Sequence, residues 1–172
     1  MSAIPPTRAD LERSLATLGG RRLVMHCHHY NVFLQRTIEE GLKDRAPQLL
    51  TAAGMEAGRL LLAGLEAEAP AGSPGEVILR AAELLRAHGF GRADVAGLGE
   101  RGGAASMERS HYAIGWTSRW GTRRTPCCFF VAGFLAGAVA VAGRIAPERV
   151  TGRELACLAA GAERCSFAVE VW

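Results

Sequence analysis

Residues 150–172 read VTGRELACLAAGAERCSFAVEVW, and this stretch decides the fold. In its second half, small or polar residues alternate with apolar ones, which is typical of a β-strand with one wet and one dry face. The small-residue segment 159–164 separates this strand from an upstream run at 150–157. We therefore predict a terminal β-hairpin made of residues 150–157 and 165–172. The small or polar set is Ser166, Ala168 and Glu170, and the apolar set is Phe167, Val169 and Val171.

Upstream of the hairpin, apolar residues recur at helical spacing in several segments. Residues 21–27 form a short apolar run, either a strand or the start of a helix. Alternating residues and turn glycines predict two or more strands within 90–102 and 104–116, and Gly54 and Gly58, four apart, predict a close contact between helices. The order indicates an α+β fold, with N-terminal helices packed on an antiparallel sheet. Helices are expected at 8–18 (ended by Gly19-Gly20), 30–42, 48–65, 76–88 and 128–143.

Composition and charge exclude several classes of protein. The chain has 172 residues, of which 49% are hydrophobic and 22% charged, so it is not a disordered chain. Its net charge of +3 is too small and scattered to indicate nucleic-acid binding. Residues 127–143 are uncharged, but the run is short and rich in small residues, which favours a buried helix over a membrane span. The N-terminus lacks the apolar segment of a secretory signal, so we expect a cytoplasmic protein without disulfides.

The cysteines near the C-terminus are spaced like metal ligands. A hairpin would place Cys157 and Cys165 on neighbouring strands, with Glu154 about one strand step before Cys157. Cys127 or Cys128, at the start of the preceding helix, would complete a set of three thiolates and one carboxylate, which suits Zn²⁺. The alternative is that these are buried, inert thiols. The spacing leaves the choice between Cys127 and Cys128 open.

Two of these segments resemble the 4-vinyl reductase domain family of small-molecule and hydrocarbon-binding proteins. Residues 126–137, PCCFFVAGFLAG, are similar to the family's Pro-x-Cys-aromatic-x3-Gly-aromatic-x-x-Gly stretch. Residues 154–167 are similar to its closing Glu-x-x-Cys-x3-Gly-x3-Cys-x-Phe motif. Because the resemblance covers residues 48–172, we expect the domain there. Residues 1–47 would be an N-terminal extension that carries a histidine cluster and packs on the core.

The resemblance implies a small α+β domain, often dimeric, with a hydrophobic ligand pocket. It also implies the fold of the ligand-binding domains of aromatic-sensing activators, shared with vesicle-transport subunits. The matching positions in this chain would hold a zinc ion at its terminal hairpin, and aromatic residues would line the pocket. The implied metal ligands are Cys128, Glu154, Cys157 and Cys165, and the candidate ligand-binding residues are Tyr112, Trp116, Phe130 and Phe134.

A histidine cluster lies outside the residues that carry this resemblance. Residues 25–31 read MHCHHYN, so three of the five histidines fall within four residues. In an extended run His26 and His28 share a face, and in a helix His26 and His29 approach each other across one turn. His111, expected on a strand along the pocket, is a candidate third ligand. Such imidazoles would fit a catalytic Fe, Cu or Zn site or a haem ligand. The alternatives are polar contacts to a ligand, helix caps and surface groups.

Two functions follow from the sequence. In the first, the chain binds a small hydrophobic or aromatic molecule, contains a structural zinc and stands alone without an effector domain. In the second, it is a metal-dependent enzyme of a biosynthetic pathway, with its chemistry at His26, His28 and His29. In either case we expect a homodimer with no nucleic acid and no membrane span.

Overall fold

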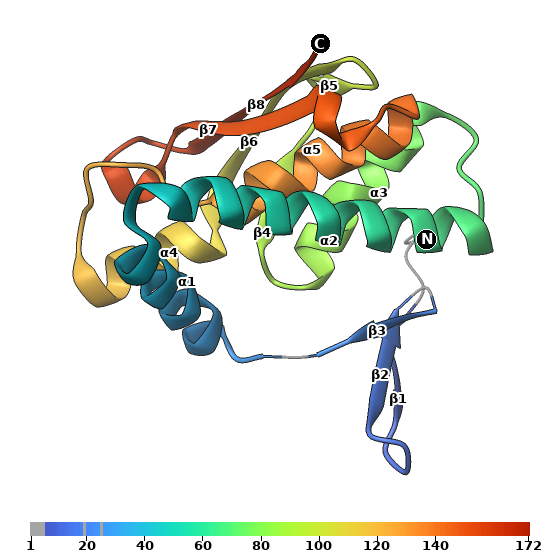
Figure 1. Cartoon of the computed structure of the whole chain (residues 1–172), viewed down its shortest axis with the longest axis horizontal. Helices are drawn as coiled ribbons and strands as arrows, with labels where there is room; N and C mark the ends of the chain where they lie inside the picture. Colours follow the sequence, from blue (N-terminus) through green and yellow to red (C-terminus); the bar gives the residue numbers. More distant parts are fainter. Residues whose placement is uncertain (1–5, 19, 25) are drawn as a thin grey trace.

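The computed structural model describes residues 6–18, 20–24 and 26–172 and has an α+β fold (Figure 1). Gly19 and Met25, and the first five residues of the expected extension, lie outside the described residues. The helices are α1 (His28–Leu42), α2 (Ala46–Glu68), α3 (Pro74–Ala87), α4 (His111–Trp120) and α5 (Phe129–Gly143), with short 3-10 turns at Lys43–Arg45, Pro147–Arg149 and Leu158–Ala160. The strands are β1 (Arg8–Asp10), β2 (Leu15–Leu18), β3 (Arg21–Leu23), β4 (Gly91–Asp94), β5 (Leu98–Gly99), β6 (Gly102–Ser110), β7 (Val150–Ala156) and β8 (Cys165–Val171).

The N-terminal segment is a small antiparallel sheet in the order β1-β2-β3, and the helix expected over residues 8–18 is wrong. The backbone N–H of Arg13 donates to Asp10 Oδ1 at 3.0 Å, and Ser14 has a φ of 52°. A side-chain bond of this kind and a left-handed residue make a turn that a helix cannot accommodate. The apolar residues of this segment therefore belong to two short strands. The ambiguous run at 21–27 begins as strand β3.

The main sheet is antiparallel, in the order β4-β6-β8-β7, with β5 paired to β6. The terminal hairpin is confirmed, because β7 pairs with β8 and places Glu154 opposite Phe167. The register shifts between Glu154 and Ala156, so the strand bends where it approaches Cys157. The predicted two-faced pattern of β8 holds for Phe167 and Val169, which are buried, and for Glu170, which is exposed.

The strand expected over residues 104–116 ends early, at Ser110, and helix α4 begins at His111. The prediction was therefore wrong for His111, which lies on a helix. Tyr112, Ala113 and Gly115 are the buried residues of α4, a spacing that follows the helical period rather than the alternation of a strand. The turn glycines and the short apolar alternation upstream hid this change of period.

Helix α5 lies at the centre of the molecule, between α2 and α3 on one side and β7 and β8 on the other (Figure 1). Residues 131–140 are all buried, so the helix is apolar around its whole circumference. Glycines let α2 and α5 approach closely: a Cβ at Gly54 would overlap the carbonyl oxygen of Phe130, and one at Gly133 would overlap that of Thr51. The close helix contact predicted from Gly54 and Gly58 is confirmed.

Within the described residues, the helices are too short or too polar to span a membrane. Helix α1 packs against both α2 and α4, so the segment with the histidines lies on the body of the molecule. Because α2 begins at Ala46, the domain boundary expected at residues 47 and 48 falls within its first turn. The two-part division of the chain stays a prediction.

Candidate metal centre and ligand cavity

Four residues predicted as metal ligands lie together at one end of the sheet. The ligand atoms of Cys128, Glu154, Cys157 and Cys165 all lie within 4.8 Å of one another. Cys128 precedes α5, Glu154 lies on β7, Cys157 follows that strand, and Cys165 begins β8. Cys128 Sγ is 3.6 Å from Cys165 Sγ, which in turn is 3.9 Å from Cys157 Sγ. The fold thus brings together residues from three elements, and their binding of a metal stays a prediction.

Cys127 lies beside this group of four, but not within it. Its Sγ atom is 3.7 Å from Cys157 Sγ, and its side chain is fully buried. The backbone N–H of Cys128 donates to Glu154 Oε2 at 2.6 Å, which fixes this carboxylate beside the Cys128 side chain. The geometry therefore favours Cys128 over Cys127 as a fourth ligand and leaves Cys127 as a thiol next to one.

The buried acidic groups of this cluster oppose one another's ionisation. Burial raises the pKa of the Glu154 carboxyl to about 7, and the charge of Cys157 adds to the rise. Burial also raises the pKa of the Cys128 thiol, whereas hydrogen bonds from Cys127, Cys128 and Cys165 lower the pKa of Cys157. One negative charge is thus stabilised at the expense of the others. A divalent cation would allow all four ligand groups to ionise together, so this donor set fits a thiolate-preferring metal such as zinc.

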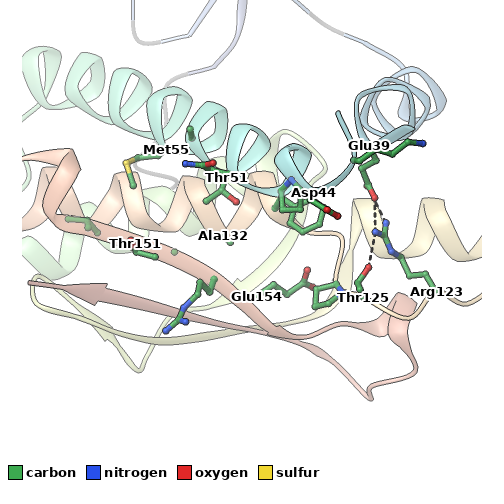
Figure 2. Close-up of a pocket in the computed structure, with 18 residues that line it drawn as sticks. Glu39, Asp44, Thr51, Met55, Arg123, Thr125, Ala132, Thr151 and Glu154 are labelled. Atoms are coloured by element: carbon green, nitrogen blue, oxygen red, sulfur yellow. Dashed lines mark hydrogen bonds and ion pairs between the residues drawn. The ribbon is translucent and has the colours of Figure 1, made fainter. Parts of the chain in front are cut away.

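The largest cavity has a volume of about 770 Å³ and lies between α2, α5 and β7 (Figure 2). Glu154 belongs both to its wall and to the cysteine cluster, and the Oε1 atom of this residue is buried without a hydrogen-bond partner among the described residues. Figure 2 shows wall residues from each of the three elements around the same space. Sequence reasoning missed them, because each is an ordinary small or apolar residue within its own element. They include Thr51, Met55, Phe129, Ala132, Val150 and Thr151.

The four aromatic residues predicted to bind the ligand do not line this cavity. Three of them pack in one aromatic cluster with Phe90, which is 5.0 Å from Phe130 and 6.0 Å from Tyr112 between ring centroids. Phe134 joins it at 6.1 Å from Phe130. Trp116 lies elsewhere, under the guanidinium of Arg123 and beside Trp120, where it lines a second cavity of about 510 Å³. Their role in binding stays a prediction.

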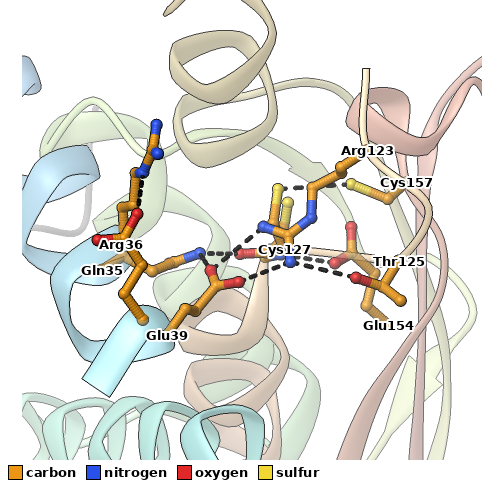
Figure 3. Close-up of polar contacts among 10 residues, drawn as sticks. Gln35, Arg36, Glu39, Arg123, Thr125, Cys127, Glu154 and Cys157 are labelled. Carbon is orange, nitrogen blue, oxygen red and sulfur yellow. Dashed lines mark hydrogen bonds and ion pairs between the residues drawn. The ribbon is translucent and has the colours of Figure 1, made fainter. Parts of the chain in front are cut away.

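A polar network joins α1 to the segment that leads into the cysteine cluster (Figure 3). Gln35 Nε2 donates to Glu39 Oε1 and to the carbonyl oxygen of Cys127, both at 2.8 Å. The guanidinium of Arg123 donates to both Glu39 oxygens, at 3.2 and 2.6 Å, and to Thr125 Oγ1. The Glu39–Arg123 pair is largely buried and forms part of the wall shared by the first two cavities. This pair therefore holds α1 against the loop before α5.

The three clustered histidines take different positions. His26 stacks on Tyr30, with ring centroids 4.3 Å apart, and His29 meets the ring of His28 edge to face at 5.4 Å. His28 alone meets His111: their Nδ1 atoms are 2.8 Å apart. The structure thus unites two of the four candidate histidines, and His26 and His29 stay exposed at the start of α1.

Three solved structures are similar to this chain. The phenol-responsive sensory domain of the transcription activator PoxR, determined with phenol, has a TM-score of 0.80 at 18% identity, covering 96% of this chain and 84% of that domain. A vinyl-4-reductase family protein from Methanocaldococcus jannaschii has a TM-score of 0.50 at 20% identity, covering 72% and 68%. A trafficking protein particle complex subunit 3 from Naegleria fowleri, covalently bound to palmitic acid, has a TM-score of 0.52 at 14% identity, covering 84% and 95%.

These likenesses define the class of the fold, an α+β domain shared by a sensory domain, a vinyl-4-reductase family protein and a trafficking subunit. The particular family is indicated by the sequence, because residues 116–171 match the model of the vinyl-4-reductase domain. The resemblance to the 4-vinyl reductase family is thus confirmed. The matched segment contains α5, the hairpin and all four residues of the metal cluster. The sequence matches none of the curated proteins with which it was compared.

Proposed function

We propose that this chain binds a small hydrophobic or aromatic molecule in the cavity between α2, α5 and β7. The observation that carries the proposal is the cavity itself. Its volume of about 770 Å³ falls within the usual range for small-molecule sites, and apolar side chains share its wall with a few polar groups. The likeness to a sensory domain determined with phenol supports an aromatic ligand. The aromatic cluster of Tyr112, Phe130 and Phe134 is the alternative location.

A structural zinc ion at Cys128, Glu154, Cys157 and Cys165 is the second part of the proposal. The donor set supports it, because three thiolates and a carboxylate form a closed tetrahedral set for this metal. The three cysteines are almost fully buried, which suits an ion that holds elements together. Such an ion would join the start of α5 to both strands of the hairpin.

The ligand proposal is tested by calorimetric titration with phenol. Thr151 lies on β7 with its side chain directed into the cavity (Figure 2), so Thr151→Trp should fill the space and abolish binding. Leu155→Trp, on the same strand but exposed and outside the wall, is the matched control and should bind as the wild type does. If Phe130→Leu abolishes binding while Thr151→Trp leaves it intact, the ligand occupies the aromatic cluster instead.

The zinc proposal is tested by metal analysis of protein purified without a histidine tag. We expect one equivalent of zinc in the wild type and its loss, with a lower melting temperature, in Cys165→Ser. Cys127→Ser is the matched control and should keep the metal, because its Sγ atom lies outside the group of four. A wild type that melts unchanged after chelation would contradict a structural ion. Loss of zinc from Cys127→Ser alone would make Cys127 the ligand.

A metal-dependent enzyme is the second candidate function. The observation that favours it is the contact between His28 and His111, which the sequence could not establish. Because His26 and His29 do not reach His111, this candidate is narrowed to two of the four histidines. We expect a mutation at His26 to leave any such activity intact.

A further inference from the structure

We infer that His28 and His111 form a second metal site, suited to a divalent ion of the nickel and copper type and independent of the cysteine cluster. Each histidine is the first residue of its helix, α1 and α4. Their Nδ1 atoms lie 2.8 Å apart although the residues are 83 positions apart in the chain. The pair therefore depends on the packing of the two helices and not on local sequence.

The ring of His28 occupies a space left for it on α4. A Cβ at Gly115 would lie 2.8 Å from Cε1 and 2.9 Å from Nε2 of His28, closer than real side-chain contacts allow. Any larger residue at Gly115 would therefore displace the ring. The side chain of Val32, one turn along α1, packs against the same glycine. The position of His28 is thus fixed by both helices.

The ring of His111 is fixed by aromatic neighbours. It meets Tyr112 and Phe90 edge to face, at centroid distances of 4.9 and 5.7 Å. The backbone N–H of His111 donates to the carbonyl oxygen of Phe90 at 2.9 Å, which holds the start of α4 beside that ring. Two imidazoles held in this way need little rearrangement to bind an ion.

The surroundings of His111 also determine which of its nitrogens is free to bind. Its Nε2 atom is buried and lacks a hydrogen-bond partner among the described residues. An aromatic face accepts an N–H better than it accepts a lone pair, so the proton belongs on Nε2. Nδ1 then carries a lone pair directed at His28. Burial, together with His28, lowers the pKa of His111 to about 4, so the ring is neutral and able to ligate near pH 7.

The separation of the two nitrogens indicates the kind of ion. Two imidazole nitrogens bound about 2.05 Å from one ion lie about 2.9 Å apart at a right angle and about 3.3 Å apart at a tetrahedral angle. The observed 2.8 Å corresponds to neighbouring positions in a square-planar or octahedral ion. In the described part of the chain, no third histidine, cysteine or carboxylate completes the set. Because His28 is exposed, the other positions face water.

The test is a titration of the untagged, zinc-containing protein with Ni²⁺, which does not oxidise thiols. We expect one equivalent to bind by calorimetry while the zinc content stays unchanged. His28→Ala and His111→Phe should each abolish this binding, and Cys165→Ser should keep it. Retention of nickel by Cys165→Ser separates this site from the proposed zinc site.

His26→Ala and His29→Ala are the matched controls, because they remove imidazoles from the same short stretch. Both should bind nickel as the wild type does. Gly115→Ala keeps every nitrogen but displaces the His28 ring, and it should weaken binding by about 10-fold or more. If His26→Ala or His29→Ala weakens binding as much as His28→Ala, a flexible run of histidines binds the ion and the proposal is wrong. Unchanged binding by Gly115→Ala would overturn it as well.

Discussion

His111 has a chemical environment that its sequence neighbours do not indicate. Ser110, His111 and Tyr112 follow an alternating strand, and nothing in that order shows that the backbone turns into α4 at His111. Its contact with His28 arises only when α1 packs on α4. In contrast, Cys157, Cys165 and Glu154 were predictable from the sequence, because a hairpin fixes their neighbourhood locally. Cys128 needed the resemblance to a family to be chosen over Cys127.

The lowered pKa of His111 predicts a pH dependence of stability. Its pKa falls from 6.5 to about 4 through burial and the proximity of His28. Between these values the unfolded chain binds more protons than the folded one, so the contribution of His111 is fully present above pH 6.5 and is lost as the pH falls towards 4. We expect the free energy of unfolding, measured in urea without added divalent ions, to decrease over this range in the wild type.

The matched variant for this prediction is His111→Phe, which keeps an aromatic ring but removes the titration. Its unfolding free energy should fall less steeply between pH 6.5 and 4 than that of the wild type. Glu154 titrates in the same range with the opposite sign but is common to both proteins, so the difference between the two curves isolates His111. Parallel curves would contradict the prediction.

At the scale of elements, the contact between α2 and α5 depends on residues without side chains. We expect Gly133→Ala to lower the free energy of unfolding by about 1–3 kcal/mol, because the added methyl would overlap the carbonyl oxygen of Thr51. Gly41→Ala is the matched control in α1, where a Cβ would meet nothing within 4 Å. It should stabilise the protein by about 0.5–1 kcal/mol. Chemical denaturation of both variants measures the difference, and equal effects would show that α2 and α5 can move apart at no cost.

The helices with a clear apolar period were predictable, and so was the hairpin. Apolar spacing located α1, α2 and α3, and the small-residue run located α5. The N-terminal strands were not, because their residues are mostly exposed and no buried face imposes a period of two. There the Asp10 turn, and not hydrophobic patterning, determines the local structure.

The whole molecule leaves apolar side chains of α1 and α2 uncovered, and we expect a two-fold dimer to cover them. Tyr30, Phe33 and Leu34 are exposed at helical spacing on α1, and Leu49 and Leu60 are exposed on α2. Burying them in an interface of about 1,600 Å² would give a stable pair of chains. Light scattering at micromolar concentration should give twice the mass of one chain.

The charge variant Leu34→Arg should shift this equilibrium towards the monomer. Leu79→Arg is the control, since Leu79 is also exposed but lies on α3. It should leave the dimer intact. A monomeric wild type would exclude the dimer, and equal dissociation by both variants would place the interface elsewhere.

The cavity is a property of the whole molecule, which is why no local pattern announced it. Its wall combines α2, α5 and β7, which are far apart in the sequence, and each contributes side chains that are ordinary within its own element. The sequence pointed instead to aromatic residues, because large rings are the visible sign of an apolar site. Most of those rings pack against one another and fill their own space.

Glu154 gives the two proposed binding events a shared thermodynamic origin. One carboxylate belongs to the wall of the cavity and to the cysteine cluster, so a change in its position or charge is felt by both. Linkage is reciprocal: if an ion held by the cluster alters the affinity for a molecule in the cavity, that molecule alters the affinity for the ion by the same factor. The metal content of a preparation will therefore set its apparent affinity for the ligand.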